Sequence, residues 1–163
     1  MSRSDFSISP ATERLVDGCR RADNPDLVRA HMSVREAVFV REQAVFTNDR
    51  DFRDADPATL HLVGVTDGDV VGAVRLYPLD YMGTWRGDRL AILPSMRRGR
   101  MAAQLVRYAV RLAGERGGHE MHAMIQLANV RFFRGLDWHE SGPVVAYAGL
   151  PHQPMRIGLS RDP

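Results

Sequence analysis

The sequence predicts an α/β protein with a mixed central β-sheet. Helical and strand-like segments alternate along most of the chain, and a short turn joins two of the strand-like segments into a hairpin. The chain has 163 residues, the size of one ordinary domain, and no repeat, low-complexity tract or linker divides it. We therefore expect one domain over residues 1–163, with residues 1 to about 12 as a loose leader.

The first half of the chain is expected to hold one helix and the hairpin. Apolar residues recur at helical spacing in residues 31–44, and we assign no element before them. Residues 60–65 and 70–77 read as strands joined by a turn at Asp67-Gly68. Gly72, inside the second strand, indicates a bulge or a close approach of another backbone.

The second half is expected to alternate strands and helices. Its best helix begins at Met101, where apolar residues follow at steps of four, three and four, and it ends at Gly114 or at Gly117-Gly118. The other expected elements are a strand at 89–93, a strand at 119–127, a helix at 129–136, and two closing strands at 144–148 and 155–159 that prolines separate.

The composition argues against several classes of partner. The formal net charge is only +2, and every cationic side chain is arginine. Cys19 stands alone and can form no intramolecular disulfide, and no apolar run approaches the ~20 residues of a membrane span. Residues 1–10 lack the apolar stretch of a signal peptide. We expect a cytoplasmic protein with no membrane partner.

Metal and nucleic-acid sites are also not expected. The acidic segment 49–56 lacks the glycine and the final acid of a calcium loop. His119 and His122 lie three residues apart on a strand, so their side chains point to opposite faces. Aromatic residues are few and do not alternate with the basic ones, which disfavours nucleic acid.

One segment of the sequence is a candidate phosphate-binding site. The strand at 89–93 is followed by a turn with Arg97, Arg98 and Arg100, and this turn opens the helix at Met101. The first N–H groups of a helix have no partner inside it, and the helix dipole adds positive character there. An anion could bind at this point, and the alternative is a solvated arginine turn.

Residues 97–102 resemble the acyl-CoA signature of the GNAT superfamily, which is an Arg or Gln, two residues, Gly, one residue, then Gly or Ala. The match departs from the pattern because Arg100 takes the place of the central glycine, and a shift to residues 98–103 puts Met101 there. The resemblance implies the GNAT fold. In that fold a mixed sheet of about six to seven strands is flanked by helices, and a splayed strand pair binds acyl-CoA.

Further segments resemble one bacterial GNAT branch that is distantly like the acyl-homoserine-lactone synthases, and a nearer likeness is the GNAT group associated with nitrilase-type gene clusters. The matches appear in the family's order along residues 31 to 160. They are the "VR..VFV.EQ" helix at 34–43, the acidic loop at 49–56, a strand led by His61, the "vvG.vRL.P" strand at 70–78, and His152 followed by Met155.

The resemblance also implies where acyl-CoA binds. A backbone N–H near Ile92 would face the developing oxyanion, and Asn129 either caps its helix or contacts CoA. Phe133 stands where many GNAT proteins have the tyrosine that acts as general acid. The full set of expected acyl-CoA-binding residues is Leu90, Ile92, Leu93, Arg97, Arg98, Gly99, Arg100, Met101, Ala102, Ala103, Asn129 and Phe133.

The general base stays open among Glu42, Asp54, His61 and His152. Imidazole side chains in general titrate near pH ~6.5, which suits a base at neutral pH. Each candidate also has an ordinary structural reading, such as a helix glutamate paired with an arginine or a histidine that bonds to a loop. We take Glu42 and His152 as the two catalytic candidates.

The implied activity is N-acyl transfer. Acetyl-CoA is the expected donor and co-substrate, and a small amine is the expected acceptor. The amine attacks the thioester directly in a ternary complex. A homodimer is one expected form of the protein. Two alternatives remain. One is a synthase like the acyl-homoserine-lactone enzymes, and the other is a non-catalytic acyl-CoA-binding module, which Arg100 and Phe133 motivate.

Overall fold

The computed structural model describes residues 14–160, so the expected leader lies outside the described residues. The strands are β1 (Gly18–Arg21), β2 (Leu60–Thr66), β3 (Asp69–Pro78), β4 (Thr84–Ile92), β5 (Glu120–Gln126), β6 (His139–Glu140), β7 (Val145–Tyr147) and β8 (Leu150–Gly158). The α-helices are α1 (Pro25–Arg35), α2 (Met101–Glu115) and α3 (Val130–Arg134). A π-helix (Glu36–Glu42) continues α1, and short 3-10 helices cover Phe52–Ala55, Pro94–Met96 and Leu127–Asn129.

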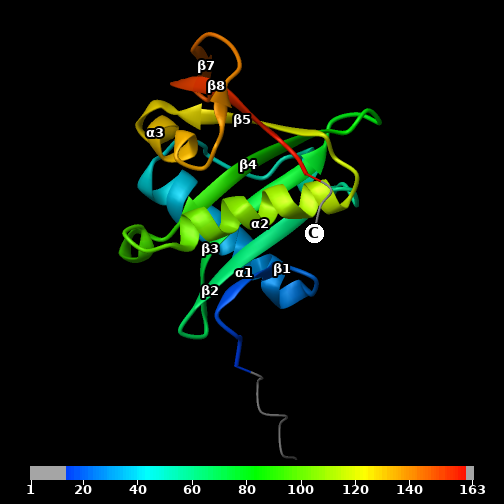
Figure 1. The fold of residues 1–163 in the computed structure, drawn as a ribbon. Helices are drawn as coiled ribbons and strands as arrows, with labels where there is room; N and C mark the ends of the chain where they lie inside the picture. The colour runs from blue at the N-terminus through cyan, green and yellow to red at the C-terminus, as the bar shows by residue number, and fades with distance from the viewer. Residues whose placement is uncertain (1–13, 161–163) are drawn as a thin grey trace, which may run out of the picture.

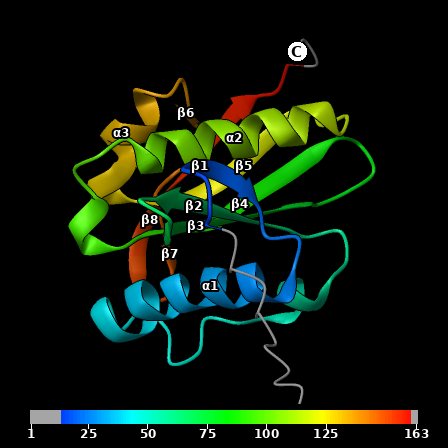
Figure 2. The ribbon, with the colours of Figure 1, turned by 90° about the horizontal axis from the view of Figure 1, so that it is seen from below.

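The strands form one mixed sheet in the order β1-β2-β3-β4-β5-β8-β6, and β7 pairs with β8 (Figure 1). β4 and β5 are parallel neighbours, and the other strand pairs are antiparallel. Helix α1 covers one face of the sheet and α2 covers the other (Figure 2). The predicted α/β fold with a mixed sheet is therefore confirmed, with eight strands in place of the expected six to seven.

The first helix begins six residues before the expected start at 31. Asn24 caps it, since its side chain accepts a hydrogen bond from the Leu27 N–H at 2.9 Å, and Pro25 stands in the first turn. The Asn-Pro pair is thus a start signal for the helix and not an interruption. The strand β1 just before it was not expected; it is a four-residue edge strand with no apolar alternation.

The hairpin of β2 and β3 is confirmed, with Asp67 at φ 52° and Gly68 at φ 81° in its turn. Of the two alternatives predicted for Gly72, the bulge is confirmed, because the register shifts beside it, where Gly64 pairs with Gly72 and Val65 with Val70. The atoms that approach Gly72 most closely belong to side chains and not to another backbone. A Cβ at this position would lie 2.8 Å from Cδ1 of Leu105 on α2 and 2.9 Å from Cδ1 of Ile92. The missing side chain lets α2 lie directly on β3.

The predicted helix from Met101 is confirmed as α2. Met101 and Leu105 are buried in the main core. The helix passes through Gly114 and ends before Gly117, which has φ 85°, while the Gly118 N–H donates to the carbonyl of Ala113 at 2.9 Å. Of the two stops that the sequence allowed, the glycine pair is the one used.

Two strand boundaries differ from the prediction. β4 starts at Thr84 and not at 89, because its polar half pairs with β3 through Tyr77↔Arg86 and Arg75↔Asp88. The closing strand β8 contains Pro151 and Pro154, which were expected to separate two strands. The carbonyl of Pro154 accepts a hydrogen bond from the Ser141 N–H on the side away from β5, so its missing N–H costs no bond to β5.

Candidate active site

A cleft opens where β4 and β5 part. The two strands pair at three positions only, Thr84↔Glu120, Trp85↔Met121 and Arg86↔His122. The β3–β4 register shifts between Ala73 and Arg75, and Arg89 has φ 53°, so β4 is bulged where it leaves β5. The cleft between the strands encloses about 990 Å³ with its open mouth included.

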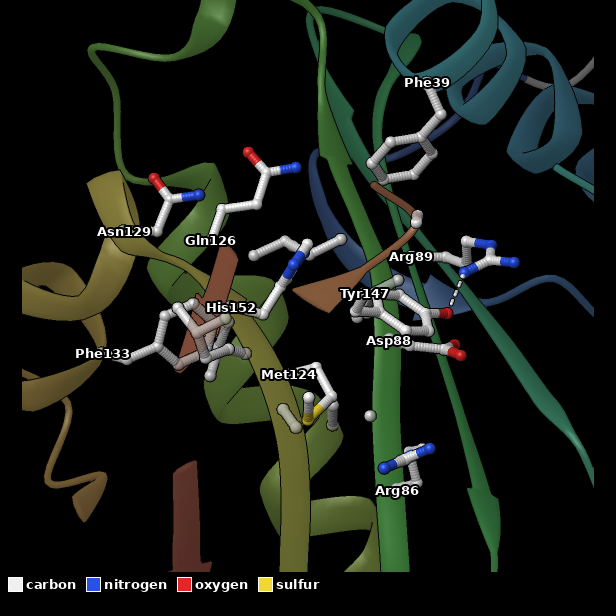
Figure 3. Close-up of a pocket in the computed structure, with 18 of the residues that line it drawn as sticks. Phe39, Arg86, Asp88, Arg89, Met124, Gln126, Asn129, Phe133, Tyr147 and His152 are labelled. Carbon is white, nitrogen blue, oxygen red and sulfur yellow. Dashed lines mark hydrogen bonds between the residues drawn. The ribbon is translucent and has the colours of Figure 1, made fainter. Parts of the chain in front are cut away.

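The α2 side of the cleft is mainly apolar and holds three of the predicted binding residues. Leu90, Asn129 and Phe133 all line it, and Figure 3 shows Asn129 and Phe133. The Asn129 side chain makes no capping hydrogen bond, although Asn129 is the N-cap residue of α3. Phe133 is 6% exposed and packs edge-on against Trp138 with ring centres 5.4 Å apart. An extended chain could lie along this wall.

The turn that opens α2 presents backbone N–H groups and arginine side chains. Its N-cap residue Arg100 makes no side-chain cap, so the N–H groups of the first turn remain available to a ligand. Arg98 and Arg100 are exposed, and neither forms an ion pair among residues 14–160. Arg100 has φ −94° and ψ −2°, which any residue adopts, so replacing the signature's glycine costs no backbone strain here.

The remaining predicted residues of this segment are divided between the core and the turn. The Met101 side chain is 5% exposed and packs where Gly64 and Gly72 leave room, so only its backbone faces the turn. Ala102 is partly buried against the main core. Ile92 is the last residue of β4, and Leu93 follows it. Gly99 lies in the turn before α2, and Ala103 lies in the first turn of that helix.

Glu42 and Arg97 form an ion pair with each other at the surface. Arg97 Nη1 donates to Glu42 Oε2 at 2.5 Å, and Arg97 Nε donates to the Ile92 carbonyl at 3.0 Å. The hydrogen bond from Arg97 lowers the pKa of Glu42, which makes this carboxylate a weaker base. Glu42 does not line the cleft, so the structure places one catalytic candidate away from the other.

His152 lies in the wall of the cleft and is 4% exposed. Its Nδ1 is 2.8 Å from the Leu150 carbonyl oxygen. A carbonyl only accepts hydrogen bonds, so Nδ1 carries a proton in this contact, and in the neutral ring the lone pair is on Nε2. The ring of Tyr147 packs edge-on against His152 at 5.2 Å, which fixes the imidazole plane (Figure 3).

The acidic loop and the strands beside it form one buried arginine–aspartate network. The bonds that hold the loop are Arg35 Nε to Asp49 at 2.6 Å, Arg35 Nη1 to Asp54 at 2.7 Å and Arg75 Nη1 to Asp51 at 2.7 Å. The other members are Asp88, which binds Arg75, His61, which binds Asp54 at 2.9 Å, and Arg89, which lies 3.4 Å from Asp51.

This network removes two of the four candidate bases from the chemistry. Burial alone would raise the pKa of Asp54, but the hydrogen bonds from His61 and Arg35 outweigh it and hold that pKa far below its usual range. Asp54 is therefore a poor base, and His61 is occupied by its bond to Asp54. Neither residue lines the cleft.

Several cleft residues were missed from the sequence. The α1 side is lined by Arg86, Asp88, Gln126 and Tyr147, and Arg89 Nη1 donates to the Tyr147 hydroxyl at 3.2 Å (Figure 3). The only usable signal was the alternation of charged residues before position 89, which belongs to the half of β4 that was not expected. Tyr147 lies on β7, within the expected strand at 144–148, but no local pattern showed that this strand would place it in the cleft beside Arg89.

Residues 25–138 match the family described as the acetyltransferase (GNAT) family. The chain belongs to this family. The predicted acyltransferase class and the predicted GNAT fold are thereby confirmed, and the splayed cleft lies within the matched residues on its β4 and β5 sides. A comparison with curated proteins finds no match.

Several solved structures share this fold. ElaA of Escherichia coli has a TM-score of 0.77 and 18% identity, over 86% of this chain and 99% of its own. An acyl-CoA N-acyltransferase from Pseudomonas aeruginosa has a TM-score of 0.73 and 24% identity, over 87% and 99%. BjaI, a CoA-dependent acyl-homoserine lactone synthase seen with SAM and isopentyl-CoA, has a TM-score of 0.71 and 19% identity. The match covers 88% of this chain and 83% of BjaI. At these identities the likeness concerns the fold alone.

Within residues 14–160, no helix combines the length and the apolar character that crossing a bilayer needs.

Proposed function

We propose that this GNAT protein transfers an acetyl or short acyl group from acyl-CoA to a small amine, which attacks the thioester directly in a ternary complex. The observation that carries the proposal is the cleft itself. The β4 wall of the cleft, which includes Leu90, leads into the turn with Arg98 and Arg100 that opens α2, and the wall formed by β8 includes His152, whose Nδ1 contacts the Leu150 carbonyl. Donor and acceptor can therefore meet between β4 and β5.

The CoA half of the site uses backbone groups. Arg98, Arg100 and the first-turn N–H groups of α2 would hold the pyrophosphate. The Leu93 N–H donates to the Val71 carbonyl at 2.9 Å, and bonding directions alternate along a strand. The Ile92 N–H therefore points away from β3 toward the gap, where it is available to the thioester oxygen as negative charge develops.

His152 Nε2 is the proposed general base. The acceptor's ammonium group first loses one proton to solvent, which frees the nitrogen lone pair. As the nitrogen forms the new bond to the acyl carbon, His152 Nε2 takes a second proton from it, directly or through one water. The C–S bond breaks and CoA leaves as its thiolate, which takes a proton from solvent. Removing the amine proton is the harder task, because a lysine-like amine with a pKa of ~10.4 is over three units from neutrality.

Phe133 supplies no acid for the leaving group. A thiol with a pKa near ~8.5 is only about 1.5 units above neutral pH, so releasing it unprotonated costs about 2 kcal/mol. That barrier is compatible with turnover. Phe133 would instead form part of the apolar wall beside the pantetheine chain.

We expect the purified protein to release CoA from acetyl-CoA when a suitable primary amine is present, and mass spectrometry should find the acetylated amine in equal amount. The assay is a thiol-reactive dye with a panel of small amines. Binding of acetyl-CoA with no CoA release on any acceptor would favour the non-catalytic module, and transfer only from long acyl donors would favour a synthase like the acyl-homoserine-lactone enzymes.

The double variant Arg98→Ala/Arg100→Ala should weaken CoA binding roughly tenfold to a hundredfold, because charge-assisted hydrogen bonds contribute about 1.5–3 kcal/mol each and salt screens these exposed ones. Titration calorimetry measures the change. Arg107→Ala is the matched control, since Arg107 is exposed on the same helix outside the cleft. Equal affinities of the double variant and the control would place the pyrophosphate elsewhere.

A further inference from the structure

The charged side chains in and beside the cleft differ in whether they have a hydrogen-bond partner. Arg75 binds Asp88 through Nε and Nη2, both at 2.7 Å. Arg89 contacts the Asp49 carbonyl at 3.2 Å and the Tyr147 hydroxyl at 3.2 Å. Arg86 differs from both. It makes no ion pair within residues 14–160, and its Nε is buried without a hydrogen-bond partner.

A buried guanidinium donor without an acceptor is unfavourable unless a ligand completes it. The forked N–H groups of arginine match the two oxygens of a carboxylate. No carboxylate in the lining is free to do this, because Asp88 already accepts from Arg75 and from the Tyr77 hydroxyl. The cleft is thus prepared for an anionic group of the substrate at Arg86.

Arg86 and His152 face the same space. Arg86 pairs with His122 on β5, and His152 pairs with Gln126 four residues further along that strand. Paired residues share a face of the sheet and alternate residues of a strand share it too, so all four side chains lie on the α1 side. At ~3.3 Å per residue the two rungs are roughly 13 Å apart, a span that the arginine side chain shortens.

We propose that the acyl acceptor is an extended amino acid whose carboxylate binds Arg86 and whose terminal amine lies at His152. The inference rests on the proposed N-acyl transfer and names the substrate class of that site. A carboxylate and an amine on the same carbon could not reach both residues, so several methylene groups must separate them. Polyamines are disfavoured, because the aspartates of the acidic loop, which could have attracted an ammonium group, are bound to Arg35 and Arg75.

The test uses three acceptors of equal length that differ at one end. They are δ-aminovalerate with a carboxylate, pentylamine with a methyl group, and cadaverine with a second ammonium group. We expect the wild-type enzyme to acetylate δ-aminovalerate with a kcat/KM at least tenfold above the other two, measured by CoA release. Glycine should be a poor acceptor, because its amine and carboxylate are too close together.

Arg86→Gln should remove this preference by raising KM for δ-aminovalerate roughly tenfold to a hundredfold, so that its kcat/KM falls to the level of pentylamine in the same variant. Arg86→Lys should restore part of it. Arg107→Gln, an exposed arginine of α2 outside the cleft, serves as the control and should behave as wild type. Thermal unfolding and acetyl-CoA affinity should match wild type in every variant and thus exclude misfolding.

Three results would overturn the inference while leaving N-acyl transfer intact. They are equal wild-type rates on all three amines, a preference that survives in Arg86→Gln, and faster turnover of the aminoalkylphosphonate of the same length, which would assign Arg86 to a phosphate. If no amine is acetylated at all although acetyl-CoA binds, the proposed function fails and this inference fails with it.

Discussion

His152→Gln is expected to lower kcat and kcat/KM together by about a hundredfold or more, with the affinity for acetyl-CoA kept. Glutamine has a similar size and can still donate to the Leu150 carbonyl, but it offers no lone pair that can take a proton at the position of Nε2. The change therefore removes the base and leaves the wall of the cleft. Steady-state kinetics with a saturating amine, together with calorimetry for acetyl-CoA, separates the two effects.

The pH–rate curve distinguishes a base from a packing residue. Protonation of Nε2 abolishes its function, so the wild-type rate should fall on the acidic side, and the variant should lose that limb. Glu42→Gln is the comparison, since Glu42 was the other candidate and is paired with Arg97 outside the cleft. A hundredfold loss in Glu42→Gln together with wild-type rates in His152→Gln would exchange the two assignments.

Asp54→Asn is expected to destabilise the protein by about 3–5 kcal/mol, because it removes one partner of a buried ion-pair network. Asp54 accepts hydrogen bonds from Arg35 and His61 and lies 3.2 Å from Arg75, and both arginine side chains are at most 1% exposed. Urea unfolding at pH 7 measures the loss. The control is Asp26→Asn, whose exposed pair with Arg29 should contribute well under about 1 kcal/mol.

Acid should reduce the difference between wild type and Asp54→Asn. The folded protein holds the pKa of Asp54 well below the ~3.9 of an unfolded chain. Above pH ~3.9 the Asp54 carboxylate therefore makes its full contribution to the free energy of unfolding. Below it the unfolded chain binds a proton that the folded state resists, and the contribution is lost as the pH falls. If the free-energy gap between the two proteins stayed constant from pH 7 to pH 3, Asp54 would not be the charged partner assigned to it here.

Much of the fold could be predicted from local sequence signals. The hairpin, α2 and its glycine stop depend on neighbouring residues, and all three are confirmed. β8 was misplaced because Pro151 and Pro154 were read as breaks, and the first helix was started too late because the capping Asn24 and Pro25 were not used as its start signal. A proline that begins a helix or leaves no bond unmade in a strand needs its context to be recognised.

The residues of the candidate site could also be predicted only in part. Leu90, Asn129 and Phe133 line the cleft as the resemblance implied, because they belong to elements whose position in the family is regular. Arg86 was missed because β4 was expected to start after it, and Tyr147 was missed although its strand was expected, because nothing local placed that strand at the cleft. Their proximity to His152 depends on how β4, β5 and β8 are ordered in the sheet.

The sequence by itself indicated the family, and it predicted a phosphate-binding turn, because a strand, an arginine turn and a helix are contiguous in the chain. Only the tertiary structure decided which charges are free to act. Glu42 and Arg97 lie 55 residues apart and neutralise each other, and the arginine of the "VR" segment and the arginine of the "RL" segment bind the acidic loop. These pairings follow from which strands and loops become neighbours in space, so no local pattern could show that Arg86 alone would be left unpaired among the charged residues lining the described cleft.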